Sequence, residues 1–396
     1  MFETICAPAP DSLMQVGRLF RADNRAEKMD LGVGTYRDGE GLIRVMDAVK
    51  EAEGWHLKSQ TGKGYLGPGG DPLFCELLAE TMFPELAAAR AGRVVHIQTP
   101  GGTGAYRLGL ELAALQSPGA RLIVGTPTWP NHVPVAERAG LGVTPYRFYD
   151  AASGEADFEA MLQAAAEAHP GDLFLLHGCC HNPTGAPLAM AQWRKLAAVL
   201  LQKRLVPVID LAYAGMAKGI AEDCAGTRLL LEQLPEAIVA ISCSKSFGLY
   251  SERVGMLTIL APARAQAEAA RSAGESLARS LWSNPPDHGA AIVRTILRNE
   301  TMRAVWLAEL EGMRRRLASL RSRLTRSGIR GSQHIGLQEG LFAILPFDER
   351  QIAALRENDA IYMDLSGRIN IAGLNDGNIG RFIDACRSVS LVPCID

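Results

Sequence analysis

The sequence lacks the cysteine spacings that mark metal-binding or disulfide-stapled proteins. None of its 8 cysteines forms a C-x-x-C pair. The adjacent Cys179 and Cys180 cannot readily bridge to each other, and no partner pattern for a zinc site accompanies them. We therefore expect buried, free thiols in a protein of a reducing compartment, and no metal.

Long apolar runs and unbalanced charge are also missing. No apolar run approaches the roughly 18 residues of a membrane span, and the N-terminal stretch MFETICAPAP has neither the basic nor the apolar region of a signal peptide. The formal net charge is −2, so nothing draws the chain toward nucleic acid or an anionic membrane. These features predict a cytoplasmic protein, and they leave room for a local basic pocket that takes a small anion.

The chain has the length and composition of an ordinary globular protein. Its 396 residues, 47% hydrophobic and 21% charged, are enough for two or three domains. Short β-rich runs alternate with helical patterns near Thr103–Leu115, Ala191–Lys203 and Pro262–Arg279, which predicts an α/β fold with a mostly parallel sheet flanked by helices. The candidate strands are Val94–Gln98, Arg121–Gly125, Asp172–His177, Leu205–Asp210, Ala237–Ser242 and Gly255–Leu260.

The pattern changes near residue 300. Apolar residues from Trp306 to Leu324 recur at alternating steps of four and three, which predicts a long amphipathic helix with a packing face. Shorter segments of mixed type follow it. We expect a large domain over 46–300 and a smaller α+β domain over 301–396, joined by that helix. Residues 1–45 are expected to form an N-terminal arm and part of the small domain.

A lysine lies in the most informative segment of the chain. Ser242-Cys243-Ser244-Lys245 follows an apolar strand directly, and open α/β sheets bind ligands at this end of their strands. A partly desolvated lysine near other cations loses its proton more readily and can form a Schiff base. Arg253, eight residues on, offers a planar fork for a phosphate. Taken alone, the segment is equally compatible with a surface loop.

Polar residues follow other predicted strands in the same way. The turn 99–105, TPGGTGA, would let backbone N–H groups approach an anion, although such a turn is often only structural. Asp210 ends a buried strand, where an unpaired carboxylate is costly, and a protonated pyridine nitrogen would be a suitable partner. Tyr213 and Asn182 could hydrogen-bond the same ligand, but Asn182-Pro183 is also an ordinary turn starter. Together these groups match a phosphorylated, pyridinium-bearing aldehyde.

The motifs resemble one family nearly from end to end. The chain is similar to the aspartate/aromatic aminotransferases, the class I, fold-type I pyridoxal-phosphate enzymes, and some phrases resemble the bacterial aromatic-type members. The matching segments are LGVGTYRD (31–38), GYLGPGG (64–70), TPGGTGA (99–105), PTWPNH (127–132), HGCCHNPTG (177–185), IDLAYAG (209–215), SCSKSFGLYSERVG (242–255), WSNPP (282–286) and SGRINIAGLND (366–376).

This resemblance implies a role for each cofactor-site residue. Lys245 matches the Schiff-base lysine and proton shuttle, and Asp210, with His132 behind it, matches the carboxylate that keeps the pyridine nitrogen protonated. Tyr213 and Asn182 match the partners of the ring oxygen. The remaining matches are the indole stacked on the ring, Trp129, and the phosphate cup, which consists of Gly102, Thr103, Ser242, Ser244, Arg253 and, from a neighbouring subunit, Tyr65.

The resemblance also implies the substrate contacts and a homodimer. Arg368 matches the arginine that binds the substrate α-carboxylate, with Gly34 beside it, and Trp129 and Asn182 complete that side. Arg279 matches the arginine that crosses from the other subunit to the side-chain carboxylate. The expected reaction exchanges an amino group between tyrosine, phenylalanine or aspartate and 2-oxoglutarate by a ping-pong cycle.

Departures from the family pattern leave the substrate class open. Trp282 stands where tyrosine is usual, Ala214-Gly215-Met216 replaces the commoner Gln-Gly-Phe, the Gly67 loop is shorter, and the side-chain pocket differs at Thr35, Ile43 and Gly64. A strict aspartate aminotransferase is therefore one alternative, and a lyase or decarboxylase of the same fold is another. An effector domain of a transcription regulator would need a DNA-binding module, for which the chain has no spare helix-turn-helix region.

Overall fold

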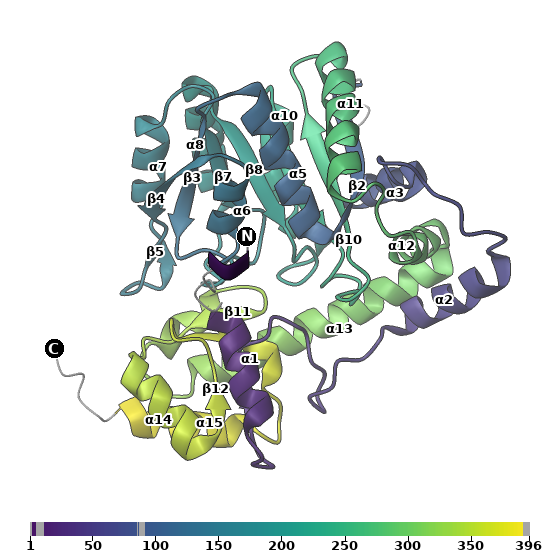
Figure 1. Ribbon diagram of the computed structural model, residues 1–396. Helices are drawn as coiled ribbons and strands as arrows, with labels where there is room; N and C mark the ends of the chain where they lie inside the picture. The colour runs from purple at the N-terminus through teal and green to yellow at the C-terminus, as the bar shows by residue number, and fades with distance from the viewer. Residues whose placement is uncertain (1, 5–11, 85, 87–91, 391–396) are drawn as a thin grey trace.

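The computed structural model describes residues 2–4, 12–84, 86 and 92–390 (Figure 1). A large domain is built on a seven-stranded sheet with helices on both faces, and the long helix α13 connects it to a smaller unit that contains α14 and α15. This is the predicted α/β class with a smaller α+β part.

The large sheet explains why the middle of the chain is so apolar. Its spatial order is β2 (Val94–Pro100), β10 (Val254–Leu260), β9 (Ala237–Ser242), β8 (Val206–Leu211), β7 (Leu173–His177), β3 (Arg121–Thr126) and β4 (Gly142–Arg147). Every pair is parallel except those that β10 makes with β2 and β9. All residues of β9 and β10 are buried, as expected for strands that are covered on both faces.

The two faces of the sheet carry separate hydrophobic clusters. Val208 belongs to the cluster that includes α5 (Gly101–Gln116), and its neighbour Ile209 belongs to the cluster on the opposite face. Successive side chains of a strand point to opposite faces, so one apolar run fills both cores. The helices α6 (His132–Arg138) and α11 (Arg264–Leu281) share the face of α5. The other face is covered by α3 (Pro72–Met82), α7 (Phe158–Glu167), α8 (Met190–Lys203), α10 (Ala225–Gln233) and α12 (His288–Arg298).

All six predicted strands are confirmed to within a residue or two, and the predicted helices are confirmed as α5, α8 and α11. β4 was not predicted; it pairs only with β3 and lies at one edge of the sheet. This strand is only partly buried and contains Pro145, which is tolerated at an edge because no ladder hydrogen bond is needed there.

The long helix α13 (Glu300–Thr325) is packed through Trp306, as its periodicity predicted. The indole is fully buried, stacks on Phe247 with ring centroids 4.4 Å apart, and donates from Nε1 to the carbonyl of Ser246 at 2.7 Å. This contact joins the helix to the segment that carries Lys245.

Trp306→Ala should destabilise the protein without touching any polar residue of the site. Loss of a buried indole typically costs about 3–5 kcal/mol, because the cavity that it leaves does not collapse fully. A thermal-unfolding scan should show a clear loss, whereas Leu307→Ala, at an exposed position of the same helix, should have little effect. Equal shifts for the two variants would contradict this account of the packing.

The smaller unit combines the C-terminal part of the chain with its N-terminal segment. β11 (Phe342–Ile344) pairs antiparallel with β13 (Arg368–Asn370), and β1 (Met29–Asp30) pairs parallel with β12 (Ile361–Tyr362). The helices here are α1 (Ser12–Ala22), α14 (Glu349–Asp359) and α15 (Ile379–Ser390). The remaining elements are α2 (Asp47–Ser59), α9 (Ile220–Asp223), the strand pair β5 (Tyr149–Asp150) and β6 (Glu155–Ala156), and the short helices η1 (Phe2–Thr4), η2 (Ser332–Leu337) and η3 (Ile371–Gly373).

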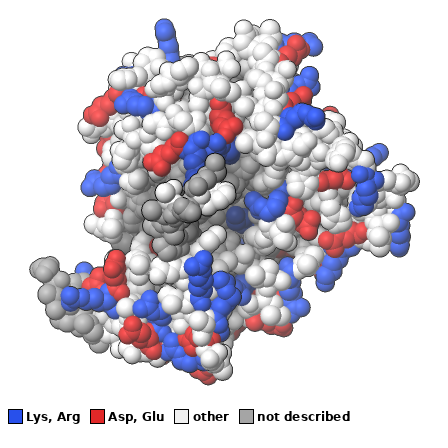
Figure 2. All heavy atoms as spheres, viewed as in Figure 1, with Lys and Arg blue, Asp and Glu red and all other residues white. Residues whose placement is uncertain are grey.

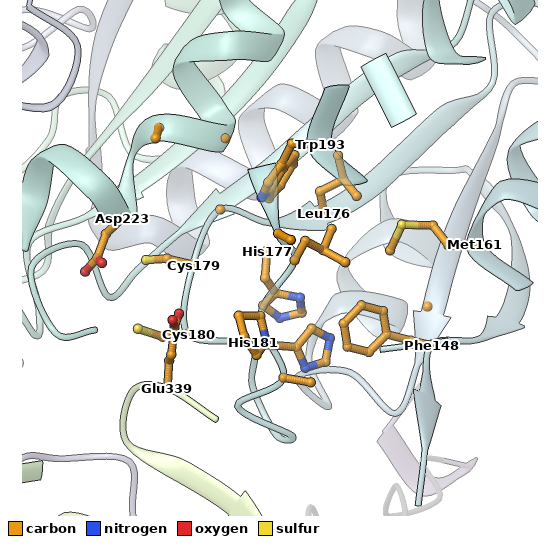
Figure 3. Close-up of a pocket in the computed structure, with 18 of the residues that line it drawn as sticks. Phe148, Met161, Leu176, His177, Cys179, Cys180, His181, Trp193, Asp223 and Glu339 are labelled. Atoms are coloured by element: carbon orange, nitrogen blue, oxygen red, sulfur yellow. The ribbon is translucent and has the colours of Figure 1, made fainter. Parts of the chain in front are cut away.

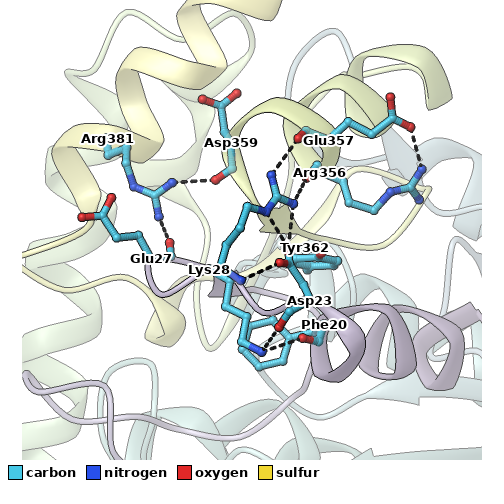
Figure 4. Close-up of polar contacts among 10 residues, drawn as sticks. Phe20, Asp23, Glu27, Lys28, Arg356, Glu357, Asp359, Tyr362 and Arg381 are labelled. Carbon is cyan, nitrogen blue, oxygen red and sulfur yellow. Dashed lines mark hydrogen bonds and ion pairs between the residues drawn. The ribbon is translucent and has the colours of Figure 1, made fainter.

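Polar contacts fasten the N-terminal segment to α14 (Figure 4). The guanidinium of Arg25 donates to the carbonyls of Arg356 and Glu357, each at 2.7 Å, and the Tyr362 hydroxyl donates to Asp23 at 2.6 Å. The last carbonyls of a helix have no partner within the helix, so a cation there satisfies them. The segment thereby leads the chain from the small unit toward Gly34.

The surface shown in Figure 2 has acidic and basic side chains interspersed, in keeping with the small net charge. Within the described residues, no helix combines the length and the apolar character needed to cross a bilayer. The cysteines at 75, 179, 180, 224, 243 and 386 are free thiols, as expected, and all of these except Cys179 are buried; Cys6 and Cys394 lie outside the described residues.

Candidate active site

The candidate site lies at the carboxyl edge of the large sheet, because neighbouring parallel strands all end there. The strands β2, β3, β7, β8 and β9 point the same way, so the residues that follow them meet at one edge. β10 runs the other way and therefore begins at this edge, which brings Arg253 to the group although it precedes its strand.

The carboxylate of Asp210 is positioned by a hydrogen bond with His132. Its Oδ2 lies 3.1 Å from Nε2 of His132, whose Nδ1 lies 2.7 Å from the Thr128 hydroxyl. Burial alone would raise the pKa of Asp210, but the hydrogen bond and charge of His132 hold it below its usual value. The Asp210 side chain keeps 15% of its surface exposed, so an ionised acid faces the site.

Lys245 provides an amine near that acid. Its Nζ lies 5.2 Å from the centre of the Tyr213 ring. Burial lowers the pKa of Lys245, the charge of Arg253 adds to this effect, and Asp210 opposes it. A lowered pKa increases the fraction of neutral amine, which is the nucleophilic form.

A cradle suited to an anion is formed where α5 begins. The Ser244 backbone N–H donates to Oγ of Ser242 at 3.2 Å, and Arg253 Nη1 donates to Oγ of Ser244 at 3.4 Å. Gly101 has a φ of +72°, and a Cβ on it would lie 2.4 Å from Arg253 Nη2. A Cβ on Gly102 would lie 2.9 Å from Cβ of Ser242. The glycines thus keep open a space where Arg253, two serines and the N-terminus of α5, with Thr103 in its first turn, converge.

Three further predicted residues surround the acid and the amine. Tyr213 is buried, and burial raises the pKa of its hydroxyl, which keeps it a neutral donor. Asn182 is buried after β7. Trp129 remains partly exposed, and its ring meets His132 edge-on with centroids 5.1 Å apart.

Arg368 reaches the site from the smaller unit. Its Nη1 lies 3.3 Å from Oδ1 of Asn182, and its Nη2 donates to the Gly32 carbonyl at 2.6 Å. The guanidinium stacks 4.5 Å above the Phe342 ring. A Cβ on Gly34 would lie 2.9 Å from Cζ of Phe342, so only glycine lets the chain pass here without a shift.

Two predicted residues are not joined to the others in the single chain. Tyr65 is 92% exposed, and Arg279 is exposed near the end of α11. Within the described part of the chain, neither makes a hydrogen bond or an ion pair with the other site residues. The family resemblance places both residues in the active site of a neighbouring subunit rather than in that of their own chain.

Several supporting residues of the site were not predicted from the sequence. Thr128 lies four positions before His132, a spacing that could have suggested the contact. The His177 ring lies edge-on to that of His132 and tilted against that of His181, with centroids 5.2 Å and 4.0 Å away, and burial lowers its pKa to about 3. Phe342 carried no local signal, since its contact with Arg368 depends on strand pairing.

Comparisons with known proteins agree with this geometry. The family model for aminotransferase class I and II matches residues 26–386. A tyrosine aminotransferase of Rhizobium meliloti (strain 1021) is 45% identical over 94% of this chain and 96% of its own. An aspartate aminotransferase of Salmonella typhi is 41% identical over 98% of this chain and 100% of its own.

A solved structure is similar in both sequence and fold. The aromatic-amino-acid aminotransferase of Burkholderia pseudomallei, determined with pyridoxal phosphate bound covalently, has a TM-score of 0.94 and 36% identity. The alignment covers 98% of this chain and 99% of that one.

Proposed function

The chain belongs to the class I and II aminotransferases, and on that premise we propose that it uses pyridoxal phosphate, held by Lys245, to exchange amino groups between amino acids and 2-oxo acids. The observation that carries this proposal is the meeting of a half-buried amine, the carboxylate of Asp210 and an anion cradle at one sheet edge. Few ligands need an amine, an acid and an anion site in that arrangement.

The residues fit this cofactor. The cradle at Gly101, Gly102, Ser242, Ser244 and Arg253 would hold its phosphate. Asp210 would hold the ring nitrogen, and Tyr213 and Asn182 would hydrogen-bond the ring oxygen, with Trp129 against the ring face. Bound in this way, the cofactor would supply an electron sink for the charge that develops at the substrate α-carbon.

The chain's own residues would move the proton and orient the substrate. The amine of Lys245, whose pKa burial lowers, would take the α-proton and deliver it to the cofactor's C4′ carbon. Arg368 would bind the α-carboxylate through its planar fork, with Asn182 and Gly34 beside it. Because Arg368 is itself positioned by the Gly32 carbonyl and Phe342, the substrate would be held in one orientation.

The side-chain specificity would be decided by Arg279 of a second copy. In the homodimer that we propose, Arg279 and Tyr65 would enter the partner's site. Exposed apolar side chains on and after α2 support such an interface, since large exposed apolar groups mark interaction surfaces. They include Trp55 at 53%, Leu57 at 82% and Tyr65 at 92% exposure.

Arg279→Ala should reduce turnover of aspartate far more than turnover of phenylalanine. Removing one partner of a charge pair between carboxylate and guanidinium is expected to lower kcat/KM for aspartate by roughly 10²-fold. Phenylalanine has no side-chain carboxylate, so its kcat/KM should change little or increase, because a buried unpaired guanidinium is costly. Initial rates of both substrates with 2-oxoglutarate measure the difference.

A matched control lies on the same helix. Arg271→Ala, also exposed on α11, should leave both rates near those of the wild type. Equal losses for aspartate and phenylalanine in Arg279→Ala would contradict the assignment. The same assay on the wild type, with tyrosine added, separates an aromatic from a strict aspartate enzyme, and product analysis would reveal a lyase or decarboxylase.

A further inference from the structure

A second cluster of chemically reactive side chains lies behind the loop that carries Asn182. Cys179 and Cys180 follow β7, and Asp223 ends α9. Their two sulfur atoms and a carboxylate oxygen all lie within 4.8 Å of one another. The three residues border a cavity of about 260 Å³, which Glu339 and Lys218 also line. In Figure 3 the two sulfur atoms and the carboxylates of Asp223 and Glu339 gather at one end of this pocket, away from Phe148 at the other.

The charges around this cluster allow a divalent cation to replace two protons. Cys180 and Asp223 are buried and Cys179 is half-buried, so an uncompensated charge among them would be costly. Glu339 forms an ion pair with Lys218 at 2.8 Å, and the buried guanidinium of Arg321 donates to the backbone carbonyl of Glu339 at 2.8 Å. The two carboxylates of Asp223 and Glu339 are thus accompanied by two cations, Lys218 and Arg321. A cation of charge +2 that displaces both thiol protons leaves this balance unchanged, which avoids the cost of burying net charge.

We propose that Cys179, Cys180 and Asp223 form a binding site for a thiophilic divalent cation, zinc in the cell, separate from the residues that act in the reaction. Two thiolates and a carboxylate suit zinc and cadmium rather than magnesium or calcium, which prefer oxygen ligands alone. The carboxylate of Glu339 lines the same cavity and would become a fourth ligand by leaving its ion pair with Lys218. Binding forms two metal–sulfur bonds and releases two protons to solvent, with no change of oxidation state.

A cation at this place would brace the segment that carries Tyr213. The Asp223 carboxylate accepts backbone N–H groups from Gly215 at 2.8 Å, Ala217 at 3.0 Å and Lys218 at 2.8 Å. The Cys180 thiol donates to the Tyr213 carbonyl at 3.8 Å. One ion would therefore link the ends of β7 and α9 through residues that already hold this turn. Binding should raise the unfolding temperature without adding a chemical step.

Titration of the holoenzyme with cadmium tests the proposal. We expect one cadmium ion per chain by equilibrium dialysis, with a thiolate-to-cadmium charge-transfer absorption that rises in step with binding. The double variant Cys179→Ser/Cys180→Ser should lose that absorption, and its affinity for cadmium should fall by a factor on the order of 100 or more. Cys75→Ser and Cys386→Ser, each a single buried thiol elsewhere, should behave like the wild type.

The same measurements distinguish this site from a second group of possible metal ligands in the described residues. His132, His177 and Asp210 also lie close together, but metal bound there would give no thiolate absorption. Absence of binding, or an absorption that persists in the double variant, overturns the proposal. Should the double variant fail to fold, X-ray absorption of the zinc-loaded wild type decides, since two sulfur neighbours at about 2.3 Å are required. A shell of nitrogen and oxygen alone would refute the assignment.

Discussion

Lys245→Ala is expected to lower turnover by roughly 10⁴-fold or more, because one side chain would both attach the cofactor and move the proton. We do not expect another lysine to replace it, since this amine lies 5.2 Å from the centre of the Tyr213 ring and burial lowers its pKa. The visible absorbance of the covalently held cofactor should disappear as well. Spectra and initial rates with aspartate and phenylalanine measure both effects.

The control for this substitution is a lysine on the surface. Lys195→Ala, which removes a side chain that is 58% exposed, should retain both absorbance and rate. In the wild type, reduction with borohydride followed by peptide mass analysis should find the cofactor on Lys245. Wild-type turnover by Lys245→Ala, or attachment to a different lysine, would refute the proposed mechanism.

Asp210→Asn should give the second largest loss of turnover, after Lys245→Ala. The amide carries no charge, so it cannot keep a bound pyridine nitrogen protonated, and it disturbs the hydrogen bond with His132. Removal of one preorganised electrostatic group typically costs about 3–4 kcal/mol of transition-state stabilisation, or roughly 10²–10³-fold in kcat. Because Lys245 is untouched, the cofactor should still attach.

The charge can be separated from the shape of the side chain. Asp210→Glu retains a carboxylate and should recover part of the rate that Asp210→Asn loses. The rate of Asp210→Asn should stay low at every pH from about 6 to 9, a range in which the wild-type acid is fully ionised. The depressed pKa of Asp210 means that ionisation is lost only in acid, below the usual range of an aspartate. Equal rates for the Asn and Glu variants would show that the charge is not needed.

The sequence by itself determined the classes of the elements, their approximate bounds and the residue types that follow each strand. These are local properties, since apolar runs, helical periodicity and the residues at strand ends are read within a window of a few positions. The family motifs added the roles of Lys245, Asp210 and Arg368, which remain proposals for this chain. The edge strand β4 was missed because its partial burial and Pro145 weaken the same local signal.

The tertiary structure alone decided which of these residues meet. Arg253 reaches the glycine turn because β10 runs antiparallel, and Arg368 reaches Asn182 across 186 positions because β13 pairs with β11 in the smaller unit. The approach of Asp223 to Cys179 and Cys180 likewise has no sequence signature. Contacts between distant positions depend on strand order, direction and packing, and these arise from the cooperation of the whole chain rather than from any local preference.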